Sequence, residues 1–266
     1  MDHLSCLENQ SIYIIREGYN RFRDVAMLWS IGKDSTTLLW LIRKAFFGNI
    51  PFPCLHLDTG YKFREIYEFR DRIAKEWNLN LKVHKNETAV ARGVSPHTGK
   101  LECCTELKTN ALKDAINALR FKALFLGIRR DEHGIRAKER VFSPRDKQFE
   151  WNYKSQPAEL WDQYKTETLD DEHIRIHPLL GWTELDIWEY IRREGIPIVS
   201  LYFAKNGKRY RSIGCETCCN PVDSDADTVD AVIEELKTTT LTERSGRAQD
   251  KESAYMMQKL RSLGYM

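Results

Sequence analysis

The chain has 266 residues, 42% of them hydrophobic, with 41 Lys and Arg against 39 Asp and Glu and a formal net charge of +2. This composition is typical of one large or two smaller folded domains and excludes a largely disordered chain. The longest apolar runs are far shorter than the roughly 20 residues that cross a bilayer, and residues 1–10 lack the pattern of a secretory signal. We therefore expect a cytoplasmic protein without membrane contact. Because the net charge is near zero, any anion site must be local.

Short apolar runs alternate with helical patterns through most of the chain. Strands are predicted at 25–29, 52–57, 79–83, 123–128 and 174–179. Apolar residues three and four positions apart predict helices over 38–46, 66–77 and 107–119. This alternation predicts an α/β fold, in which a mostly parallel, doubly wound sheet carries helices on both faces.

The second half of the chain is less regular. Residues 130–172 are polar and read as a long functional loop. A capping-box pattern at Thr183 predicts a helix to residue 193, and an acidic amphipathic helix is expected over 223–236. The charged tail 241–266 is predicted to end in a short helix. We expect two units, an α/β domain at 1–200 and a C-terminal extension at 201–266.

The segment Ser30-Ile31-Gly32-Lys33-Asp34-Ser35-Thr36 follows the first predicted strand and opens the next helix. At the carboxyl ends of parallel strands, helix N-termini offer N–H groups and a positive dipole end to anions. Gly32 permits close backbone approach, Lys33 supplies charge, and the Ser30, Ser35 and Thr36 hydroxyls can donate to phosphate oxygens. Asp34 would hold Mg²⁺ or cap the helix. The same residues also suit a plain polar turn, and neither the Walker nor the dinucleotide-binding glycine pattern is present.

The chain contains seven cysteines, which is an odd number. A chain of this length does not need disulfides to fold, and a reducing compartment argues against a disulfide framework. Two pairs stand out, the tandem Cys103-Cys104 and the Cys-x-x-Cys pair of Cys215 and Cys218. A tandem pair suits zinc poorly because paired zinc ligands are usually separated by two or more residues. Four thiolates are a better match for an iron–sulfur cluster. Cys6 and Cys54 receive no role.

Several blocks resemble the adenine nucleotide alpha hydrolases, and within them the phosphoadenosine-phosphosulfate reductase and sulfate adenylyltransferase small-subunit group. The 30–35 turn resembles that superfamily's pyrophosphate loop. The other blocks occur in the family's order at 57–60 with 62–65, 127–132, 136–140, 182–188 and 242–247. The resemblance implies an enzyme whose nucleotide-binding domain cleaves ATP between the α and β phosphates and transfers the adenylyl group to an oxyanion.

The resemblance also implies roles for residues of these blocks, with ATP and Mg²⁺ as cofactors. Lys33, Asp34, Arg129 and Arg130 are the candidate catalytic residues. The candidate nucleotide ligands are Ser30, Gly32, Lys33, Asp34, Ser35, Thr36, Asp58, Gly127, Arg244 and Arg247. The plainer interpretations stay open, because arginines also form solvated surface ion pairs and an Asp before a Gly also caps a turn.

The cysteines depart from the sulfate adenylyltransferase small subunit, which lacks these pairs. Cys103, Cys104, Cys215 and Cys218 instead resemble the ligands of the [4Fe–4S] cluster in adenylylsulfate reductases. No cysteine follows Cys219, so the nucleophile of those reductases is missing. An adenylylating loop with a cluster and no reductase thiol resembles the ATP pyrophosphatase of bacterial DNA phosphorothioation systems. That resemblance implies DNA, a cysteine desulfurase and other sulfur-transfer proteins as partners.

The leading hypothesis is therefore an ATP pyrophosphatase that activates a DNA backbone phosphate for sulfur insertion. In this hypothesis the stretch 205–211, with Tyr202 and Phe203 beside it, would meet DNA, although an ordinary surface loop explains it equally well. The alternative is a sulfate adenylyltransferase small subunit that makes adenylyl sulfate with a GTPase large subunit. A reductase-like protein or a metal-stabilised nucleotide-binding module is the second alternative.

Overall fold

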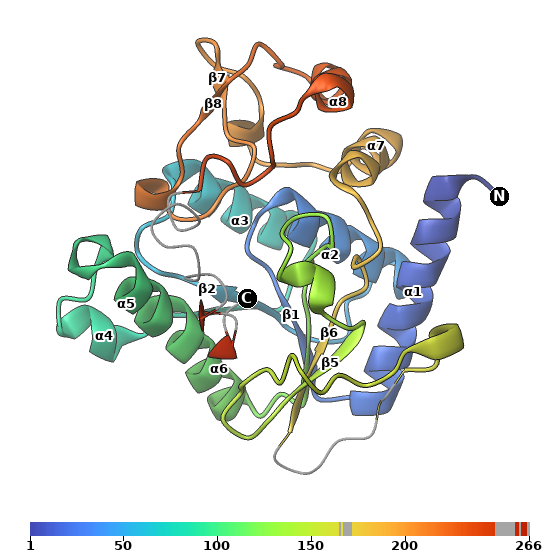
Figure 1. Ribbon diagram of the computed structural model, residues 1–266, viewed down its shortest axis with the longest axis vertical. Coiled ribbons are helices and arrows are strands. Elements are labelled where there is room, and N and C mark those ends of the chain that lie inside the picture. The colour runs from blue at the N-terminus through green and yellow to red at the C-terminus, as the bar shows by residue number, and fades with distance from the viewer. Residues whose placement is uncertain (165, 167–171, 248–258, 261, 265–266) are drawn as a thin grey trace.

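The computed structural model describes residues 1–164, 166, 172–247, 259–260 and 262–264, and its centre is a six-stranded sheet (Figure 1). The strands are β1 (Val25–Leu28), β2 (Cys54–Leu57), β3 (Leu81–His84), β4 (Ala123–Phe125), β5 (Phe142–Arg145) and β6 (His173–Ile176). Their order is β3-β2-β1-β4-β6-β5. All neighbours are parallel except β5, which runs antiparallel to β6. The predicted α/β class with a mostly parallel sheet is confirmed.

Helices cover both faces of the sheet. They are α1 (His3–Phe22), α2 (Lys33–Ala45), α3 (Arg64–Glu76), α4 (Glu87–Ala91), α5 (Lys100–Cys104), α6 (Ala111–Leu119), α7 (Glu184–Glu194) and α8 (Val229–Thr238). A second sheet pairs β7 (Lys208–Arg209) with β8 (Val222–Asp223). None of the helices within the described residues has the length and apolar character needed to span a membrane.

Side chains on alternate positions of β1 divide the core into two layers. Val25 and Met27 pack in the layer that holds the apolar residues of α1, α2, α3 and α7. Ala26 and Leu28 point the other way and join the buried residues of α6. Because neighbouring side chains of a strand point to opposite faces, a fully apolar strand such as β1 requires helices on both sides.

Helix α1 was not predicted, although its buried residues recur at helical spacing. Ile14, Ile15 and Gly18 are buried on the face that meets the sheet. A Cβ on Gly18 would lie only 2.7 Å from Ile176 Cδ1, so the glycine allows the helix to pack closely on β6. Exposed Cys6 belongs to this helix.

Other predicted boundaries are corrected by tertiary contacts. The 130–172 region contains β5, an edge strand that pairs with β6 and that the loop interpretation missed. The helix predicted from 107 begins as a π-helical turn, Thr105–Asn110, which continues into α6. The helix predicted from 223 starts at Val229, because Asp223 ends β8. The short helix expected at the end of the tail falls largely outside the described residues, and the boundary at residue 200 stays a prediction.

Candidate active site

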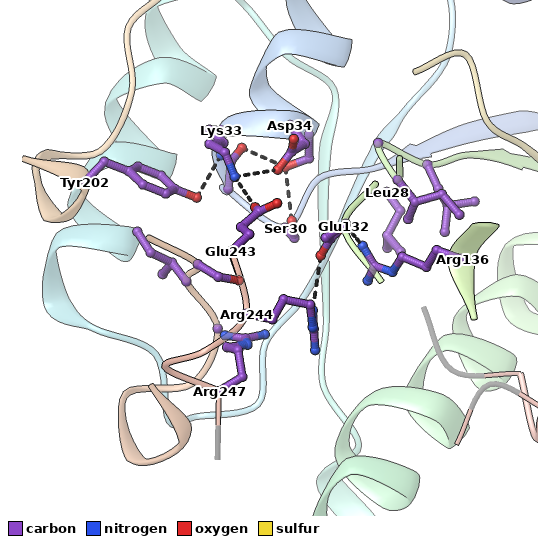
Figure 2. A pocket seen from close by; sticks show the side chains of 18 of the residues that line it. Leu28, Ser30, Lys33, Asp34, Glu132, Arg136, Tyr202, Glu243, Arg244 and Arg247 are labelled. Carbon is purple, nitrogen blue, oxygen red and sulfur yellow. Dashed lines mark hydrogen bonds and ion pairs between the residues drawn. The ribbon is translucent and has the colours of Figure 1, made fainter. Parts of the chain in front are cut away.

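A pocket opens where β1 and β4 end, at the point where the strand order reverses. In open α/β sheets this switch point is the usual place for a ligand. The residues that line it come from widely separated parts of the chain, and several of them are drawn in Figure 2. They include Ser30, Gly32, Lys33, Asp34, Ser35, Lys62, Lys108, Gly127, Glu132, Arg136, Tyr202, Gly214, Glu243, Arg244 and Arg247.

The loop between β1 and α2 is held in an unusual backbone conformation. Ile31 has a φ of 69° and is buried in the core. A β-branched residue at positive φ is a true outlier that costs about 1–3 kcal/mol and is concentrated at functional sites. Gly32 follows as the extended N-cap of α2. The strained turn therefore directs the α2 N-terminus into the pocket.

Gly127, just after β4, lets α2 approach the sheet at this point. A Cβ on Gly127 would stand 2.9 Å from the carbonyl oxygen of Asp34, which is closer than real Cβ contacts. The glycine therefore contributes to the site by packing as well as by lining the pocket.

Lys33 is 1% exposed, yet its ammonium group lies in the pocket wall. The Nζ atom donates to Glu243 Oε1 over a short contact and to Asp34 Oδ2 at 3.3 Å, and Glu184 Oε1 lies 3.9 Å away. The backbone N–H of Lys33 donates to the Tyr202 hydroxyl at 2.9 Å. Both donors that this residue could offer a phosphate are thus engaged by the protein itself.

Arg129 is fully buried behind the pocket and connects three carboxylates. It forms short ion pairs with Asp34 and Glu243, and its Nε donates to Asp131 Oδ1 at 2.9 Å. Burial alone would raise the pKa of Glu243, but Arg129 and Lys33 hold it well below the usual glutamate range. Glu243 is therefore ionised at neutral pH.

The opposite wall carries a second charge cluster. Glu132 pairs with Arg136 over a short contact and accepts a hydrogen bond from Arg244 Nη1 at 3.1 Å (Figure 2). Nearby, Arg211 pairs with Glu184 at 2.8 Å. Buried charges of this kind persist only when they are paired, so the pocket is an ionic network rather than an apolar cavity.

Most of the predicted nucleotide ligands meet in this pocket, but four of the predicted catalytic and binding residues do not line it: the buried Arg129 described above, and Thr36, Asp58 and Arg130. Thr36 is buried, and its hydroxyl accepts a hydrogen bond from Trp29 Nε1 at 3.2 Å. Asp58 accepts from the Gly60 N–H and the Tyr67 hydroxyl, each at 2.8 Å, which matches the turn-cap interpretation. Arg130 is exposed outside the pocket. The structure thus gives Thr36 and Asp58 structural partners and leaves Arg130 on the surface.

Six charged or aromatic pocket residues were not assigned to the nucleotide site from sequence. They are Lys62, Lys108, Glu132, Arg136, Tyr202 and Glu243. Four of them fall in the blocks that carry the family resemblance, which was the available signal. Tyr202 and Lys108 lie outside these blocks. Only the fold brings them to the pocket, so no sequence pattern indicated their place there.

The stretch predicted to meet DNA has its two arginines buried. Arg209 is 1% exposed and pairs with Glu235 at 2.7 Å, Arg211 pairs with Glu184, and Tyr202 faces Lys33. Only the turn at 205–208 is exposed. Arg209 and Arg211 neutralise carboxylates inside the protein, so of the cations expected to meet DNA only Lys205 and Lys208 are exposed.

The four paired cysteines gather beside the pocket. Burial, followed by the neighbouring thiols Cys104, Cys215 and Cys218, raises the pKa of Cys103 to about 12. Burial also opposes ionisation of Cys215, but Lys108 and Lys62 outweigh it and lower that pKa to about 7. Thiols of both predicted pairs thus influence the pKa of Cys103, and their joint role stays a prediction.

The cysteines and the carboxylates of the pocket do not by themselves form a site for a single metal ion. Within the part of the chain that the structure describes, no group of three or more His, Cys, Asp or Glu side chains is placed to hold a metal ion. Asp34, the residue considered for Mg²⁺, is engaged by Lys33 and Arg129. The [4Fe–4S] cluster and the magnesium ligand therefore stay predictions.

Comparison of the sequence with known proteins matches the chain to a family. The sequence model of the phosphoadenosine phosphosulfate reductase domain matches residues 24–221. The chain is 44% identical to sulfate adenylyltransferase subunit 2 of Zymomonas mobilis and 43% identical to that of Klebsiella pneumoniae, with 100% of this chain and 98% of each relative covered.

Solved structures support the fold. A phosphoadenylyl-sulfate reductase from Candida auris, in a phosphate complex, aligns with a TM-score of 0.57 at 18% identity, covering 84% of this chain and 97% of that one. FMN adenylyltransferase from Candida glabrata, in complex with ATP, aligns with a TM-score of 0.58 at 15% identity, covering 99% of this chain and 83% of that one. At such identities the likeness concerns the fold alone.

Proposed function

The chain belongs to the phosphoadenosine phosphosulfate reductase domain family, and from this premise we propose that it transfers the adenylyl group of ATP to sulfate with release of pyrophosphate. The observation that carries the proposal is the convergence of Lys33, Arg129 and the N-terminus of α2 at the switch point of the sheet. The near full-length similarity to sulfate adenylyltransferase subunits supports sulfate as the acceptor.

Attack of an oxyanion on the α-phosphorus breaks the bond to the bridging oxygen and leaves pyrophosphate with additional negative charge. Cationic groups fixed where that charge develops lower the barrier most effectively. Lys33 and Arg129 are both buried at this place, so their positive charges would lie close to the leaving pyrophosphate. Mg²⁺ that enters with ATP would neutralise part of the same charge.

The acceptor needs its own cations, and the cysteine side of the pocket supplies them. Lys62, Lys108 and Arg247 line this side. Arg247 Nη1 donates to Cys219 Sγ at 2.8 Å, and no carboxylate partner of Arg247 is recorded within the described residues. A doubly charged tetrahedral anion such as sulfate suits this environment.

A partner subunit follows from the same similarity. The relatives are named as the second subunit of their enzymes. The family resemblance implies that the other subunit is a GTPase. We propose that this chain works with such a large subunit in the cytoplasm.

The DNA phosphorothioation hypothesis receives no support from the relatives named above, and the 205–211 stretch no longer supports it. The gathered thiols remain the observation in its favour. Their donor chemistry fits an iron–sulfur cluster, because four buried thiols stand beside cations that would balance the cluster's negative charge. A cubane also spaces its ligands more widely than a single ion does. We propose that Cys103, Cys104, Cys215 and Cys218 hold such a cluster.

The function is tested by measuring pyrophosphate release from ATP by the purified chain with its large subunit, with and without sulfate. We expect release to depend on sulfate and to yield adenylyl sulfate. Release that requires DNA and a cysteine desulfurase instead would favour the phosphorothioation hypothesis. ATP binding without pyrophosphate release under either condition would favour a nucleotide-binding module.

The cluster is tested separately by anaerobic purification and iron analysis. About four irons per chain, lost on Cys104→Ser, are expected for a cubane with four cysteine ligands. Colourless, iron-free protein would contradict the cluster and leave the adenylyltransferase proposal intact.

A further inference from the structure

Glu243 occupies the place where a phosphate would be expected. Its carboxylate donates no proton and accepts from two cations, with Oε1 on Lys33 Nζ (Figure 2) and Oε2 on Arg129 Nη2. The side chain is buried, and it reaches the α2 N-terminus from a segment 210 residues further along the sequence. A carboxylate held by two cations at a helix N-terminus has the charge and hydrogen-bonding pattern of a bound phosphate group.

Tyr202 occupies a second donor that a bound phosphate would use. The Lys33 N–H is one of the unpaired donors that a helix N-terminus offers an anion, and the Tyr202 hydroxyl accepts it at 2.9 Å. The same hydroxyl would lie 3.3 Å from a Cβ on Gly32, so it fills the space over the glycine. The backbone and side-chain donors of Lys33 are therefore both satisfied without a nucleotide.

The segment that carries Glu243 also divides a larger space. The pocket beside Lys33 holds about 120 Å³, which is below the roughly 300 Å³ of the smallest typical ligand sites. A neighbouring cavity of about 750 Å³ lies on the other side. Glu132, Glu243 and Arg244 line both spaces. Withdrawal of Glu243 would join them into one cavity large enough for a nucleotide.

We propose that Glu243 is a built-in competitor of the nucleotide phosphates for Lys33 and Arg129. The inference rests on the proposed function, since it assigns these two cations to the phosphates of ATP and pyrophosphate. A phosphate and the ionised carboxylate cannot share the two cations without strong repulsion, so each binding event exchanges one for the other. The exchange weakens nucleotide binding and favours release of pyrophosphate, because Glu243 returns to the cations as the product leaves.

The exchange also requires a movement of the chain around Glu243. The 242–247 segment is tied by short-range hydrogen bonds, from the Ser245 N–H to the Thr242 carbonyl and from the Arg247 N–H to the Arg244 carbonyl. Arg244 follows Glu243 directly and pairs with Glu132 on the far wall. Displacement of the carboxylate therefore loosens this segment while phosphate is bound.

The test compares wild-type protein with Glu243→Gln by calorimetric titration with pyrophosphate and with a non-hydrolysable ATP analogue at fixed ionic strength. Glu243→Gln is expected to bind pyrophosphate at least about tenfold more tightly, since the competing charge is gone. The matched control is Glu139→Gln, which breaks another buried ion pair, with Arg145, outside the pocket. It is expected to show no gain in affinity.

Unchanged or weaker binding by Glu243→Gln would overturn the proposal, because it would mean that Glu243 only holds Lys33 and Arg129 in position. Glu243→Asp, which keeps the charge but shortens the side chain, provides a second variant with an expected smaller gain. In wild-type protein, the amide hydrogens of Ser245 and Arg247 should exchange faster when pyrophosphate is bound. Equal or slower exchange would also contradict the proposal.

These titrations are independent of adenylyl transfer. Tighter pyrophosphate binding by Glu243→Gln in a protein that shows no sulfate-dependent turnover would support the competitor and reject the proposed function. Sulfate-dependent turnover without any gain in the pyrophosphate affinity of Glu243→Gln would support the proposed function and reject the competitor.

Discussion

Replacing Arg129 with alanine tests whether the buried ionic network holds the site together. Arg129 is fully buried and pairs with Asp34, Asp131 and Glu243. Its removal leaves Lys33 as the cation that faces both Asp34 and Glu243. Removing one partner of a buried ion pair costs about 3–5 kcal/mol, and Asp131, which is partly exposed, adds little to that cost. We therefore expect Arg129→Ala to lose about 3–5 kcal/mol of unfolding free energy at pH 7.

The unfolding free energy that Arg129→Ala loses should depend on pH, and the pKa of Glu243 sets the direction of that dependence. In the wild type its pKa is held below the ordinary value of 4.5, so the ionised carboxylate stabilises the fold above pH 4.5. That contribution disappears as the pH falls toward the folded-state pKa. Without Arg129 the pKa moves back toward the ordinary value. The difference between wild type and variant should therefore shrink below pH 4.5, by at most about 1.4 kcal/mol per pH unit.

Urea unfolding at pH 7 and at pH 3.5, followed by tryptophan fluorescence, measures both effects. Arg130→Ala is the matched control, because its side chain is exposed next to Arg129 and a change of no more than about 0.5 kcal/mol is expected. A loss below about 1 kcal/mol for Arg129→Ala, or a loss that is the same at both pH values, would refute the reasoning.

Three further substitutions test single contacts. Lys33→Ala should lower the rate of pyrophosphate release by about 10²–10³-fold, as expected for removal of a group that stabilises transition-state charge, and near-normal release in a kinetic assay would contradict the role of Lys33. Gly127→Ala should destabilise the protein by about 1–3 kcal/mol, because the new Cβ would meet the Asp34 carbonyl oxygen at 2.9 Å; an unchanged melting temperature would show that α2 can shift at no cost. Thr183→Ala should cost about 1 kcal/mol in urea unfolding, since its hydroxyl accepts the Asp186 N–H at 3.1 Å, and Thr183→Ser should restore most of the loss.

Local patterns in the sequence were enough to predict the α/β class and the parallel strands, although not α1 or β5. Apolar strands followed by helical periodicity predicted the parallel sheet, and the turn at 30–36 predicted the start of α2 at the pocket. The capping box at Thr183 is present as predicted. These features depend on residues close together in the chain, so the residues themselves contain the necessary information.

Hydrogen bonds and ion pairs between residues far apart in the chain could not be predicted from local patterns. Nothing local to Glu243 indicates that it reaches Lys33, and nothing local to Tyr202 indicates that it covers the Lys33 N–H. An ion pair or hydrogen bond forms only where the packed elements bring two groups within a few ångströms.

The sequence by itself thus determined the fold class, the position of the phosphate turn and the presence of two cysteine pairs. The tertiary structure decided that Lys33 of the turn and Arg129, which follows β4, are both neutralised by a carboxylate from the 242–247 segment. The physical reason is that periodicity and turn chemistry act between neighbouring residues, whereas charge pairing in a buried site depends on where the complete chain places each group.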